Sequence, residues 1–595
     1  MKMRVADYLT SKLYDAGGEC VFLITGGMIM HLTDALRQHG KQRYICCHHE
    51  QAAVMAAESY GRFTGELGVA YVTAGPGALN ALNGVVGAYV DNSPVVIVAG
   101  QSKVQQAKVT TPRQFALQGF NTLPIYSQVT KYAVMLDDLT KVKYEVEKCI
   151  WTAKEHRVGP VWIESPVDIQ GAMFDPDDYT GFTPPKKESS DPNLEKKVLE
   201  VAEAIRKSRR PCILTGAGIR LSGAIETLHA FAKKTNIPIC TSRLGMDLIG
   251  HEDPLFVGRP GTYGDRSANF AMQNSDLLLN IGCRMGIGLV SYDWQNFAMY
   301  AKKVSVDIDE KELNKPSVIP DIPVKADAKE FLELLTKALG DYRLDNPKWV
   351  AQTQLWKKKY PTDLPEYKKE TNGINSYHFY RKLSDKAPAD AVFSVDTGSC
   401  FHVFAQAFRV KFGQRHLITG GLSTMGYMPG SIGVAAANHG KDVYCITGDG
   451  SLQMNIQELQ TIVQNQLPIK LIVLSNGGYL LIRLTQTNFM DSRFIGIDKA
   501  TGMSCPDLKK IAWAYGLKYM KIAKTSSLNK KLDELFSTKG PLICEVISPN
   551  NQVLQPRVAS KKLDDGRMVS MPYDDMFPFL PRDEYEKNTV RDKIL

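Results

Sequence analysis

No apolar stretch of the sequence is long enough to cross a bilayer, and residues 1–7 contain no apolar core of the kind that signal peptides carry. The eleven cysteines, which include the adjacent pair Cys46-Cys47, show neither paired CxxC spacing nor a regular framework. We interpret them as reduced thiols of a buried core. We therefore expect a cytoplasmic protein without a membrane partner.

A concentrated charge of either sign is also missing. The net charge of +9 arises from 72 basic and 63 acidic residues that are spread along the chain. So thin an excess does not indicate a nucleic-acid surface, and anionic groups of a cofactor or substrate account for some of it. With 44% hydrophobic and 23% charged residues, the composition is typical of a soluble globular protein, and 595 residues are too many for one core.

Strand-like apolar runs alternate with helix-like segments, which is the pattern of parallel α/β sheets. The predicted strands are residues 21–24, 44–47, 69–73, 95–98, 211–215, 238–241, 277–281, 304–308, 392–395, 443–446, 469–474 and 542–546. Among the predicted helices are residues 28–37 and 51–63.

Two polar stretches interrupt this alternation. Residues 175–197 carry Pro184-Pro185 and a run of charges, and the stretch from 340 to 373 carries Trp349, Trp356 and several lysines. We interpret both as linkers. They divide the chain into three α/β domains, 1–180, 190–340 and 374–550, followed by a tail, 551–595.

Polar residues follow two predicted strands of the third domain. Gly448-Asp449-Gly450-Ser451 comes after the strand 443–446, and Asn476-Gly477-Gly478 comes after the strand 469–474. Because the carboxyl ends of parallel strands meet at one edge of a sheet, a carboxylate and an amide are expected there together. Mg²⁺ requires hard oxygen ligands and shares them with phosphates, so Asp449, Asn476 and a backbone carbonyl near Gly478 are candidate ligands.

The glycines of the first motif add a place for an anion. Gly448 and Gly450 allow a tight turn and bring N–H groups close to phosphate oxygens, and Ser451 opens a predicted helix, 452–466, whose N-terminus would face the anion. Either motif alone is an ordinary turn. Together they predict a magnesium diphosphate cradle of the kind that holds thiamine diphosphate (TPP).

In the first domain, His48-His49-Glu50 stands between the strand 44–47 and a predicted helix. One interpretation of Glu50 is a first-turn carboxylate that favours the helix dipole. The other is an acid that hydrogen-bonds a ring nitrogen of the TPP pyrimidine and shifts the cofactor to its imino tautomer. That role requires partial burial, which keeps the proton available.

Several longer segments resemble one known family. They are HEQAAVMAAESYGR at residues 49–62, TAGPGALN at 73–80, GPVWIESPVDIQ at 159–170 and GGLSTMG at 420–426. On these segments the chain resembles the acetolactate synthase and pyruvate oxidase branch of TPP-dependent enzymes, and the similarity fades only in the tail. The resemblance implies three doubly wound parallel-sheet domains: pyrimidine-binding, central and diphosphate-binding.

The resemblance also implies roles for individual residues. Glu50 becomes the cofactor-activating acid, Met425 the apolar residue that keeps TPP bent, and the carbonyl of Ser423 the acceptor for the pyrimidine amine. For Met425, ordinary core packing is the alternative. The expected cofactor contacts are Pro76, Asn80, Ser423, Met425, Gly448, Asp449, Gly450, Ser451, Met454, Asn476 and Gly478, of which Asp449, Asn476 and Gly478 bind Mg²⁺.

Residues near the reacting centre follow from the same resemblance. Gln118 is expected to be catalytic, and Arg113, Lys131 and Leu481 are expected to contact substrate. Solvated polar surface is the alternative for Arg113 and Lys131, and core packing is the alternative for Leu481.

The middle domain resembles the flavin-binding unit of the family in Gly216-Ala217-Gly218, Gly282-Cys283-Arg284 and Asp327-Ala328. A lone Gly-x-Gly is equally explained by tight packing between a strand and a helix. An acidic stretch of the family is replaced here by Met285-Gly286-Ile287-Gly288. Flavin adenine dinucleotide (FAD) binding and a vestigial site therefore both stay open.

The expected reaction is TPP-dependent decarboxylation of a 2-keto acid, pyruvate first of all, and ligation of the remaining fragment to a carbonyl acceptor. Four alternatives stay open: a nucleotide-linked keto sugar as acceptor in polysaccharide biosynthesis, a simple decarboxylase, a flavin oxidase, and a non-catalytic TPP-binding scaffold. The tail, 551–595, departs from the biosynthetic enzymes and is a candidate cap for the active site. The resemblance places the Glu50 domain of one subunit against the diphosphate domain of another, so at least a homodimer is expected.

Overall fold

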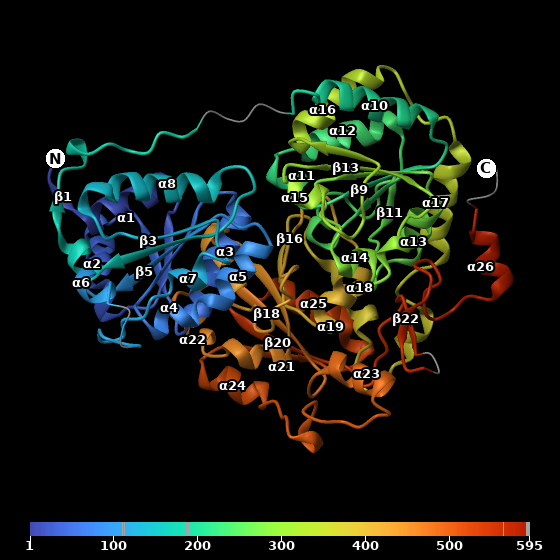
Figure 1. The fold of residues 1–595 in the computed structure, drawn as a ribbon. Helices are drawn as coiled ribbons and strands as arrows, with labels where there is room; N and C mark the ends of the chain where they lie inside the picture. Colours follow the sequence, from blue (N-terminus) through green and yellow to red (C-terminus); the bar gives the residue numbers. More distant parts are fainter. Residues whose placement is uncertain (110, 112, 186–190, 563–564, 591–595) are drawn as a thin grey trace.

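The computed structural model describes residues 1–109, 111, 113–185, 191–562 and 565–590. Three six-stranded sheets form three domains, and every strand pairing within these sheets is parallel (Figure 1). This confirms the predicted α/β class with three parallel-sheet domains. None of the helices in the described residues has the length and apolar character needed to cross a membrane.

The first domain has the strand order β3-β2-β4-β5-β7-β6. Its strands are β2 (Cys20–Leu23), β3 (Arg43–Cys46), β4 (Gly68–Val72), β5 (Val95–Gln101), β6 (Tyr132–Met135) and β7 (Val161–Pro166). Its main helices are α1 (Val5–Asp15), α2 (Met30–His39), α3 (Glu50–Thr64), α4 (Pro76–Asn80), α5 (Leu82–Val90) and α8 (Val142–Lys154). The central strands are apolar along their length because helices cover both faces of the sheet.

The third domain has the order β16-β15-β17-β18-β20-β19. Its strands are β15 (Val392–Val395), β16 (Arg415–Ile418), β17 (Val443–Gly448), β18 (Ile469–Ser475), β19 (Lys518–Ile522) and β20 (Leu542–Ile547). Its main helices are α18 (Ser376–Lys386), α19 (Ser399–Ala407), α20 (Gly430–Ala437), α22 (Glu458–Gln464), α23 (Leu480–Phe489), α24 (Leu508–Ala514) and α25 (Leu528–Ser537). When strands are numbered within each domain, this order repeats that of the first domain.

The central domain differs from the other two, with the order β11-β10-β9-β12-β13-β14. Its strands are β9 (Pro211–Thr215), β10 (Ile239–Thr241), β11 (Phe256–Gly258), β12 (Leu277–Ile281), β13 (Lys302–Asp307) and β14 (Ile322–Lys325). Its main helices are α10 (Leu194–Lys207), α12 (Ile225–Thr235), α13 (Arg266–Asn274), α16 (Ala328–Leu339) and α17 (Pro347–Lys359). Numbered within the domain, the order is that of dinucleotide-binding folds, whose ligands bind where the strand order reverses. Here that point lies between β9 and β12.

The structure revises two sequence predictions. The second linker contains α17, whose Trp349 and Trp356 are both fully buried in the core of the central domain. The indole N–H of Trp349 donates to the carbonyl of Pro211 at 2.9 Å. The helix predicted over 452–466 is broken into α21 (Asp449–Leu452), the 3-10 helix η7 (Gln453–Asn455) and α22.

The first and third domains share one apolar core, in which α3 packs directly on α20. A Cβ added at Gly433 of α20 would lie 1.9 Å from the backbone carbonyl oxygen of Ala56 in α3. Only a glycine allows this approach, so the backbones of α3 and α20 lie in close contact.

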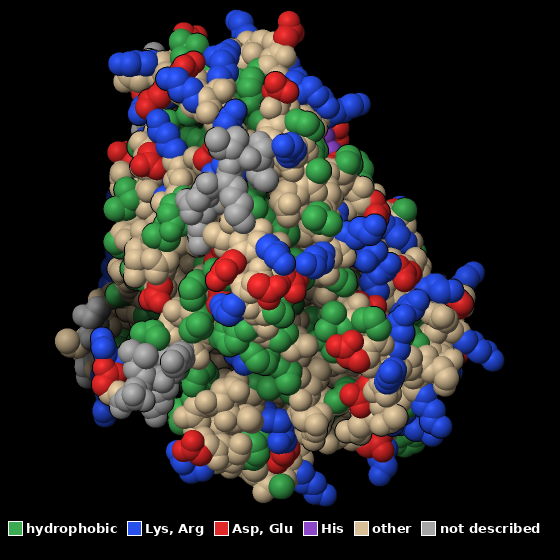
Figure 2. All heavy atoms as spheres, turned by 90° about the vertical axis from the view of Figure 1, so that its right-hand side faces the viewer, with side chains coloured by type: hydrophobic (Ala, Val, Ile, Leu, Met, Phe, Trp, Pro, Cys, Tyr) green, Lys and Arg blue, Asp and Glu red, His purple; other side chains and the backbone are tan. Residues whose placement is uncertain are grey.

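The tail runs back over the central domain and ends in α26 (Arg582–Asn588), beside α17 (Figure 1). Arg266 donates to the carbonyl of Pro578 at 2.7 Å, and the indole of Trp356 donates to Asn588 Oδ1 at 2.8 Å. On the face that carries the tail, Lys and Arg side chains lie among Asp and Glu side chains and apolar ones (Figure 2).

Candidate functional site

Asp449 lies where the strand order of the third domain reverses, between β15 and β17. It follows β17 directly and is the first residue of α21, with only 1% of its surface exposed. One carboxylate oxygen accepts from the N–H of Gly450 at 2.8 Å, and the other accepts from the N–H of Gly477 at 2.6 Å. Burial raises the pKa of Asp449 to about 6, and backbone N–H groups of the two motifs oppose the rise.

The hydrogen bond from Gly477 joins the two motifs that the sequence singled out. Asn476 follows β18, the strand next to β17, so its half-buried side chain lies at the same edge of the sheet as Asp449. Gly478 has φ +153°, and a Cβ there would lie 1.8 Å from the carbonyl oxygen of Ile497. The site therefore offers one carboxylate, one amide and a backbone segment without side-chain bulk.

The described residues contain no group of three or more His, Cys, Asp and Glu that could hold a metal ion by themselves. A cation at Asp449 would need further oxygen ligands from a phosphorylated molecule bound beside it. That is how Mg²⁺ binds phosphorylated cofactors, since it takes one or two protein oxygens and completes its octahedron with phosphate and water.

Asp396, which is not among the predicted site residues, accepts hydrogen bonds from residues at this edge of the sheet. It directly follows β15 and is 1% exposed, and one of its oxygens accepts from Ser451 Oγ and from Thr447 Oγ1, each at 2.7 Å. Ser451 Oγ in turn accepts from the N–H of Gly426 at 2.7 Å. A carboxylate directly after a predicted strand was the available signal. Ser451 thus ties the diphosphate motif to the segment 420–426.

Glu50 is the first residue of α3 and is only 8% exposed. Its Oε2 accepts from Asn80 Nδ2 at 3.0 Å, so two predicted site residues meet. A Cβ at Gly77 would lie 3.2 Å from Glu50 Oε1, and glycine there leaves the carboxylate accessible from α4. Glu50 is therefore a buried carboxyl group with one oxygen bound by Asn80 and the other accessible.

Pro76 opens α4, and the loop that carries Gln118 packs against the residue before it. A Cβ at Gly75 would lie 2.6 Å from the carbonyl oxygen of Gln118, which itself has φ +57°. Gln118 and Arg113 are exposed at this edge. The structure therefore brings Gln118 close to Pro76. Among the described residues, Arg113 has no hydrogen-bond partner.

The segment 420–426 carries the residues expected to hold the cofactor bent. Ser423 is exposed with φ +52°, Met425 is half-buried, and a Cβ at Gly426 would lie 2.5 Å from Met454 Cβ. Met454 is 48% exposed. Two methionines therefore flank the end of this segment, next to Ser451.

Of the residues expected to contact substrate, Lys131 lies away from Glu50, whereas Leu481 lies shortly after the Asn476 motif. Lys131 precedes β6, at the amino ends of the strands, and its Nζ donates to the carbonyls of Thr152 and Glu155, the latter at 2.7 Å. Burial lowers its pKa to about 8. Leu481 in α23 packs, half-buried, against the core of the third domain. Lys131 is held at the opposite edge of its sheet from Glu50, and its contact with substrate stays a prediction.

Within the described parts of the chain, no hydrogen bond joins the Glu50 group to the Asp449 group. Hydrogen bonds between the two domains lie elsewhere, in and just before α3 and just after α5. The backbone N–H of His48 donates to Glu458 Oε1 at 3.0 Å, and Tyr427 donates to Glu58.

A cavity of about 600 Å³ lies where the three domains meet, and Gly420, Gly421 and Ser423 of the segment 420–426 form part of its wall. The loops after β9 and β12 line it, so it lies where the strand order of the central domain reverses. Arg243 and Arg284 supply positive charge to its wall, and Asp307 and Asp327 supply carboxylates. Burial lowers the pKa of Arg243 to about 10.

Comparison with protein families identifies all three domains. Residues 3–124 match the family described as the thiamine pyrophosphate enzyme, N-terminal TPP binding domain. Residues 198–335 match its central domain, and residues 396–546 match its C-terminal TPP binding domain.

Curated relatives match nearly the whole chain. The acetolactate synthase large subunit of Haemophilus influenzae is 32% identical over 552 residues, which is 91% of this chain and 94% of the relative. Acetolactate synthase isozyme 2 large subunit of Escherichia coli is 30% identical, covering 91% and 95% respectively. The acetolactate synthase large subunit of Cyanidium caldarium is also 30% identical, covering 91% and 92%.

Proposed function

The chain belongs to the thiamine pyrophosphate enzymes, in the branch of the acetolactate synthase large subunits, and from that premise we propose that it decarboxylates a 2-keto acid and ligates the remaining fragment to a carbonyl acceptor. Pyruvate is the donor that the names of the relatives favour. The observation that carries the proposal is the buried Asp449 carboxylate, joined through the Gly477 N–H to the Asn476 motif.

The residues present fit Mg²⁺ and the diphosphate of TPP. Asp449 and Asn476 would each supply one oxygen and the Gly478 region a carbonyl, while backbone N–H groups at the start of α21 would bind the phosphate oxygens. The carboxylate is fixed by two N–H donors before any cation arrives, so its orientation costs little on binding. When bound, TPP supplies the electron sink that decarboxylation of a 2-keto acid requires.

Glu50 would hold and move a proton at the pyrimidine ring. Its side chain is buried, Asn80 donates to one carboxylate oxygen, and the other oxygen stays open beside Gly77. Met425 and the carbonyl of Ser423 would orient the pyrimidine from the third domain. Gln118 and Arg113, exposed at the Glu50 edge, would face the acceptor.

A complete site requires a second copy of the chain. Large apolar side chains are exposed at both edges that carry site residues, which is unusual for a monomer. Those of the first domain are Met30, Leu79, Phe115, Leu117 and Phe120, and those of the third are Leu422, Met454, Ile482, Met490 and Ile495. In a two-fold dimer, the Glu50 edge of one copy would cover the Asp449 edge of the other.

We further propose that the central cavity takes FAD. Its volume suits a cofactor, and the strand order around it is that of dinucleotide-binding folds. Asp307 and Asp327 would accept from ribose hydroxyls, and Arg243 would face the diphosphate. A Cβ at Gly286 or Gly288 would meet no atom within 4 Å, so neither residue is needed for packing. Purified protein should be yellow, whereas colourless protein whose absorbance is unchanged by added FAD would contradict this assignment.

The reaction is tested with pyruvate, TPP and Mg²⁺. We expect CO₂ release by the wild-type chain and almost none by Glu50→Gln, with Glu66→Gln as the matched control because Glu66 is a half-exposed carboxylate just after the same helix. Unchanged turnover by Glu50→Gln would overturn the mechanism. The acceptor is then identified with a panel of candidates: a second molecule of pyruvate, other keto acids and nucleotide-linked keto sugars. Release of free acetaldehyde alone would indicate a simple decarboxylase.

A further inference from the structure

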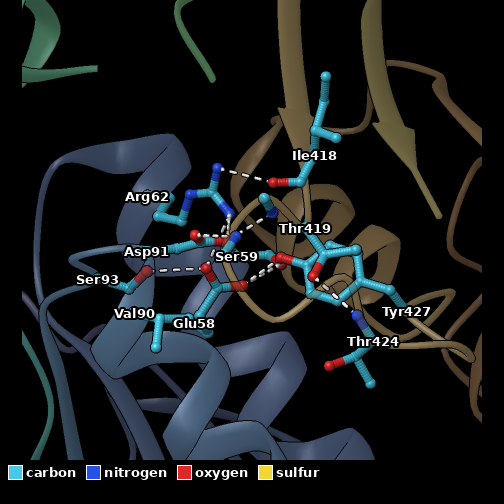
Figure 3. Close-up of polar contacts among 12 residues, drawn as sticks. Glu58, Ser59, Arg62, Val90, Asp91, Ser93, Ile418, Thr419, Thr424 and Tyr427 are labelled. Atoms are coloured by element: carbon cyan, nitrogen blue, oxygen red, sulfur yellow. Dashed lines mark hydrogen bonds and ion pairs between the residues drawn. The ribbon is translucent and has the colours of Figure 1, made fainter. Parts of the chain in front are cut away.

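A buried polar network joins the first and third domains behind the segment 420–426 (Figure 3). Glu58 accepts from Ser93 at 2.8 Å, from Arg62 at 3.0 Å and from the hydroxyl of Tyr427. Arg62 also lies 3.8 Å from Asp91 Oδ2 and donates to the carbonyl of Ile418 at 3.2 Å. The network therefore spans from α3 to both ends of the chain segment that follows β16.

Asp91 is the member that touches this segment at its start. Its two carboxylate oxygens accept from the backbone N–H groups of Gly420 at 2.8 Å and Gly421 at 2.7 Å. Asp91 is 8% exposed, and burial raises its pKa while Arg62 and the two N–H groups oppose the rise. One carboxylate of the first domain thus fixes two consecutive peptide groups of the third.

The far end of the segment is fixed as well. The N–H of Gly426 donates to Ser451 Oγ at 2.7 Å, its carbonyl accepts from Asn455 at 2.6 Å, and Tyr427 reaches Glu58. Between the two fixed ends stand residues 422–425, which include Ser423 and Met425.

The backbone between these ends is strained. Ser423 has φ +52°, a conformation that residues with a side chain adopt rarely and that persists only when the surroundings impose it. The hydrogen bonds of Asp91 and Ser451 fix the two ends of the segment, and within it Ser423 Oγ donates to the Gly420 carbonyl at 3.3 Å and Thr424 Oγ1 to Asn83 Oδ1 at 3.4 Å. Gly421 is required for the hydrogen bonds of Asp91, because a Cβ there would lie 2.8 Å from Arg284 Nη2 and 3.0 Å from Asp91 Oδ1.

We propose that Asp91 is a positioning residue that holds segment 420–426 in the conformation in which Ser423 and Met425 meet the cofactor. The inference rests on the proposed function, since it assumes that TPP binds against this segment. Asp91 lies in the wall of the central cavity and acts on the expected TPP site only through the two peptide groups that it binds. Arg62 forms an ion pair with Asp91, and its hydrogen bond to Glu58 holds Arg62 in place.

The alternative is that the network only ties two domains together, which buried ion pairs also do. Ser93 separates the two roles. It belongs to the same network and is fully buried, but it bonds Glu58 and has no described contact with segment 420–426. Ser93→Ala is therefore the matched control for Asp91→Asn.

The experiment measures TPP affinity by quenching of intrinsic fluorescence, the near-ultraviolet circular dichroism of the bound cofactor, and Tm. Asp91→Asn keeps the shape of the side chain but offers an amide N–H to a backbone N–H. We expect a loss in TPP affinity of roughly tenfold or more, because one charge-assisted buried hydrogen bond is broken and one donor is left unpaired. The dichroism of bound TPP should change as well, and Ser93→Ala should lower Tm with an affinity within about twofold of the wild type.

Gly421→Ala provides a second variant, because its methyl group pushes the segment away from Asp91 while the network stays intact. It should reproduce the loss in TPP affinity, and it tests the role of Asp91 if Asp91→Asn does not fold. Wild-type affinity and dichroism in Asp91→Asn or in a folded Gly421→Ala would overturn the inference and leave the proposed function standing. Failure of the wild-type chain to bind TPP would instead overturn the proposed function.

Discussion

At the scale of single residues, the site is built from carboxylates that are fixed by backbone N–H groups before any ligand arrives. Asp449 and Asp91 each bind two such groups, and Asp396 binds two hydroxyls and the N–H of Thr397. Asp449 and Asn476 were predictable, because each directly follows an apolar strand at a sheet edge where ligands bind. Asp91 was not, because its partners lie in another domain and its own neighbours in the sequence carry no signal.

Asp449→Asn should remove most of the affinity for Mg²⁺ while the backbone hydrogen bonds partly remain. An amide oxygen is a weaker ligand than a carboxylate, so the Mg²⁺ concentration needed for half-maximal TPP binding should rise about tenfold or more. A Mg²⁺ titration of TPP binding measures this. Asp390→Asn, on a surface ion pair with Lys441, is the control, and an unchanged Mg²⁺ requirement in Asp449→Asn would remove this residue from the cation site.

His416 should make the protein less stable at mildly acidic pH. Its ring stacks on that of Phe393, with 5.2 Å between the ring centroids, and burial lowers its pKa to about 3. Below about pH 6.5, the unfolded chain binds a proton that the folded chain does not, so stability falls as the pH falls from there towards 3, by about 1.4 kcal/mol per pH unit.

Replacing this histidine with an apolar ring should remove that dependence. Tm of His416→Phe should exceed the wild-type value by a margin that widens as the pH is lowered from neutral towards 5. The exposed His439, changed to Gln, serves as the control. A margin that stays constant with pH would show that His416 is protonated in the folded state.

At the scale of elements, the sequence predicted most inner strands, except β7, and of the edge strands only β3. Residues 211–215, 277–281 and 392–395 match β9, β12 and β15 fully, because strands covered on both faces are continuous apolar runs. The edge strand β19 alternates exposed lysines with buried residues, and β14 contains Pro323. Neither pattern differs enough from a loop or an amphipathic helix to be recognised.

The contact between α3 and α20 is the element-scale feature most sensitive to a single methyl group. Gly433→Ala would place a Cβ at 1.9 Å from the carbonyl of Ala56, and we expect overpacking to lower stability by about 1–3 kcal/mol, with a lower Tm. Gly87→Ala in α5 is the control, since its Cβ would meet no atom within 4 Å and a helical alanine adds up to about 1 kcal/mol. Equal Tm values for the two variants would contradict close packing of α3 on α20.

At the scale of the whole molecule, the proposed dimer makes a prediction that no monomer shares. Glu50→Gln and Asp449→Asn are each expected to be inactive, but in a mixed dimer one of the two sites combines the intact Glu50 of one copy with the intact Asp449 of the other. Co-expression of the two variants should therefore restore about a quarter of wild-type activity, because half of the randomly formed dimers are mixed and each has one intact site.

The two variants expressed separately and mixed only in the assay are the control for this complementation. Activity that stays absent after co-expression, with mixed dimers demonstrated by differently tagged copies, would place the whole site within one chain.

The sequence by itself predicted the three parallel sheets, the two polar motifs at Asp449 and Asn476, and the resemblance to the family. Each of these depends on contiguous residues, such as an apolar strand and the polar turn that follows it. The tertiary structure alone decided that α17 belongs to the central core, that Lys131 lies at the opposite edge of its sheet from Glu50, and that Asp91 binds Gly421, 330 residues along the chain. Such contacts depend on how whole domains pack, and two residues that distant carry no local signal of each other.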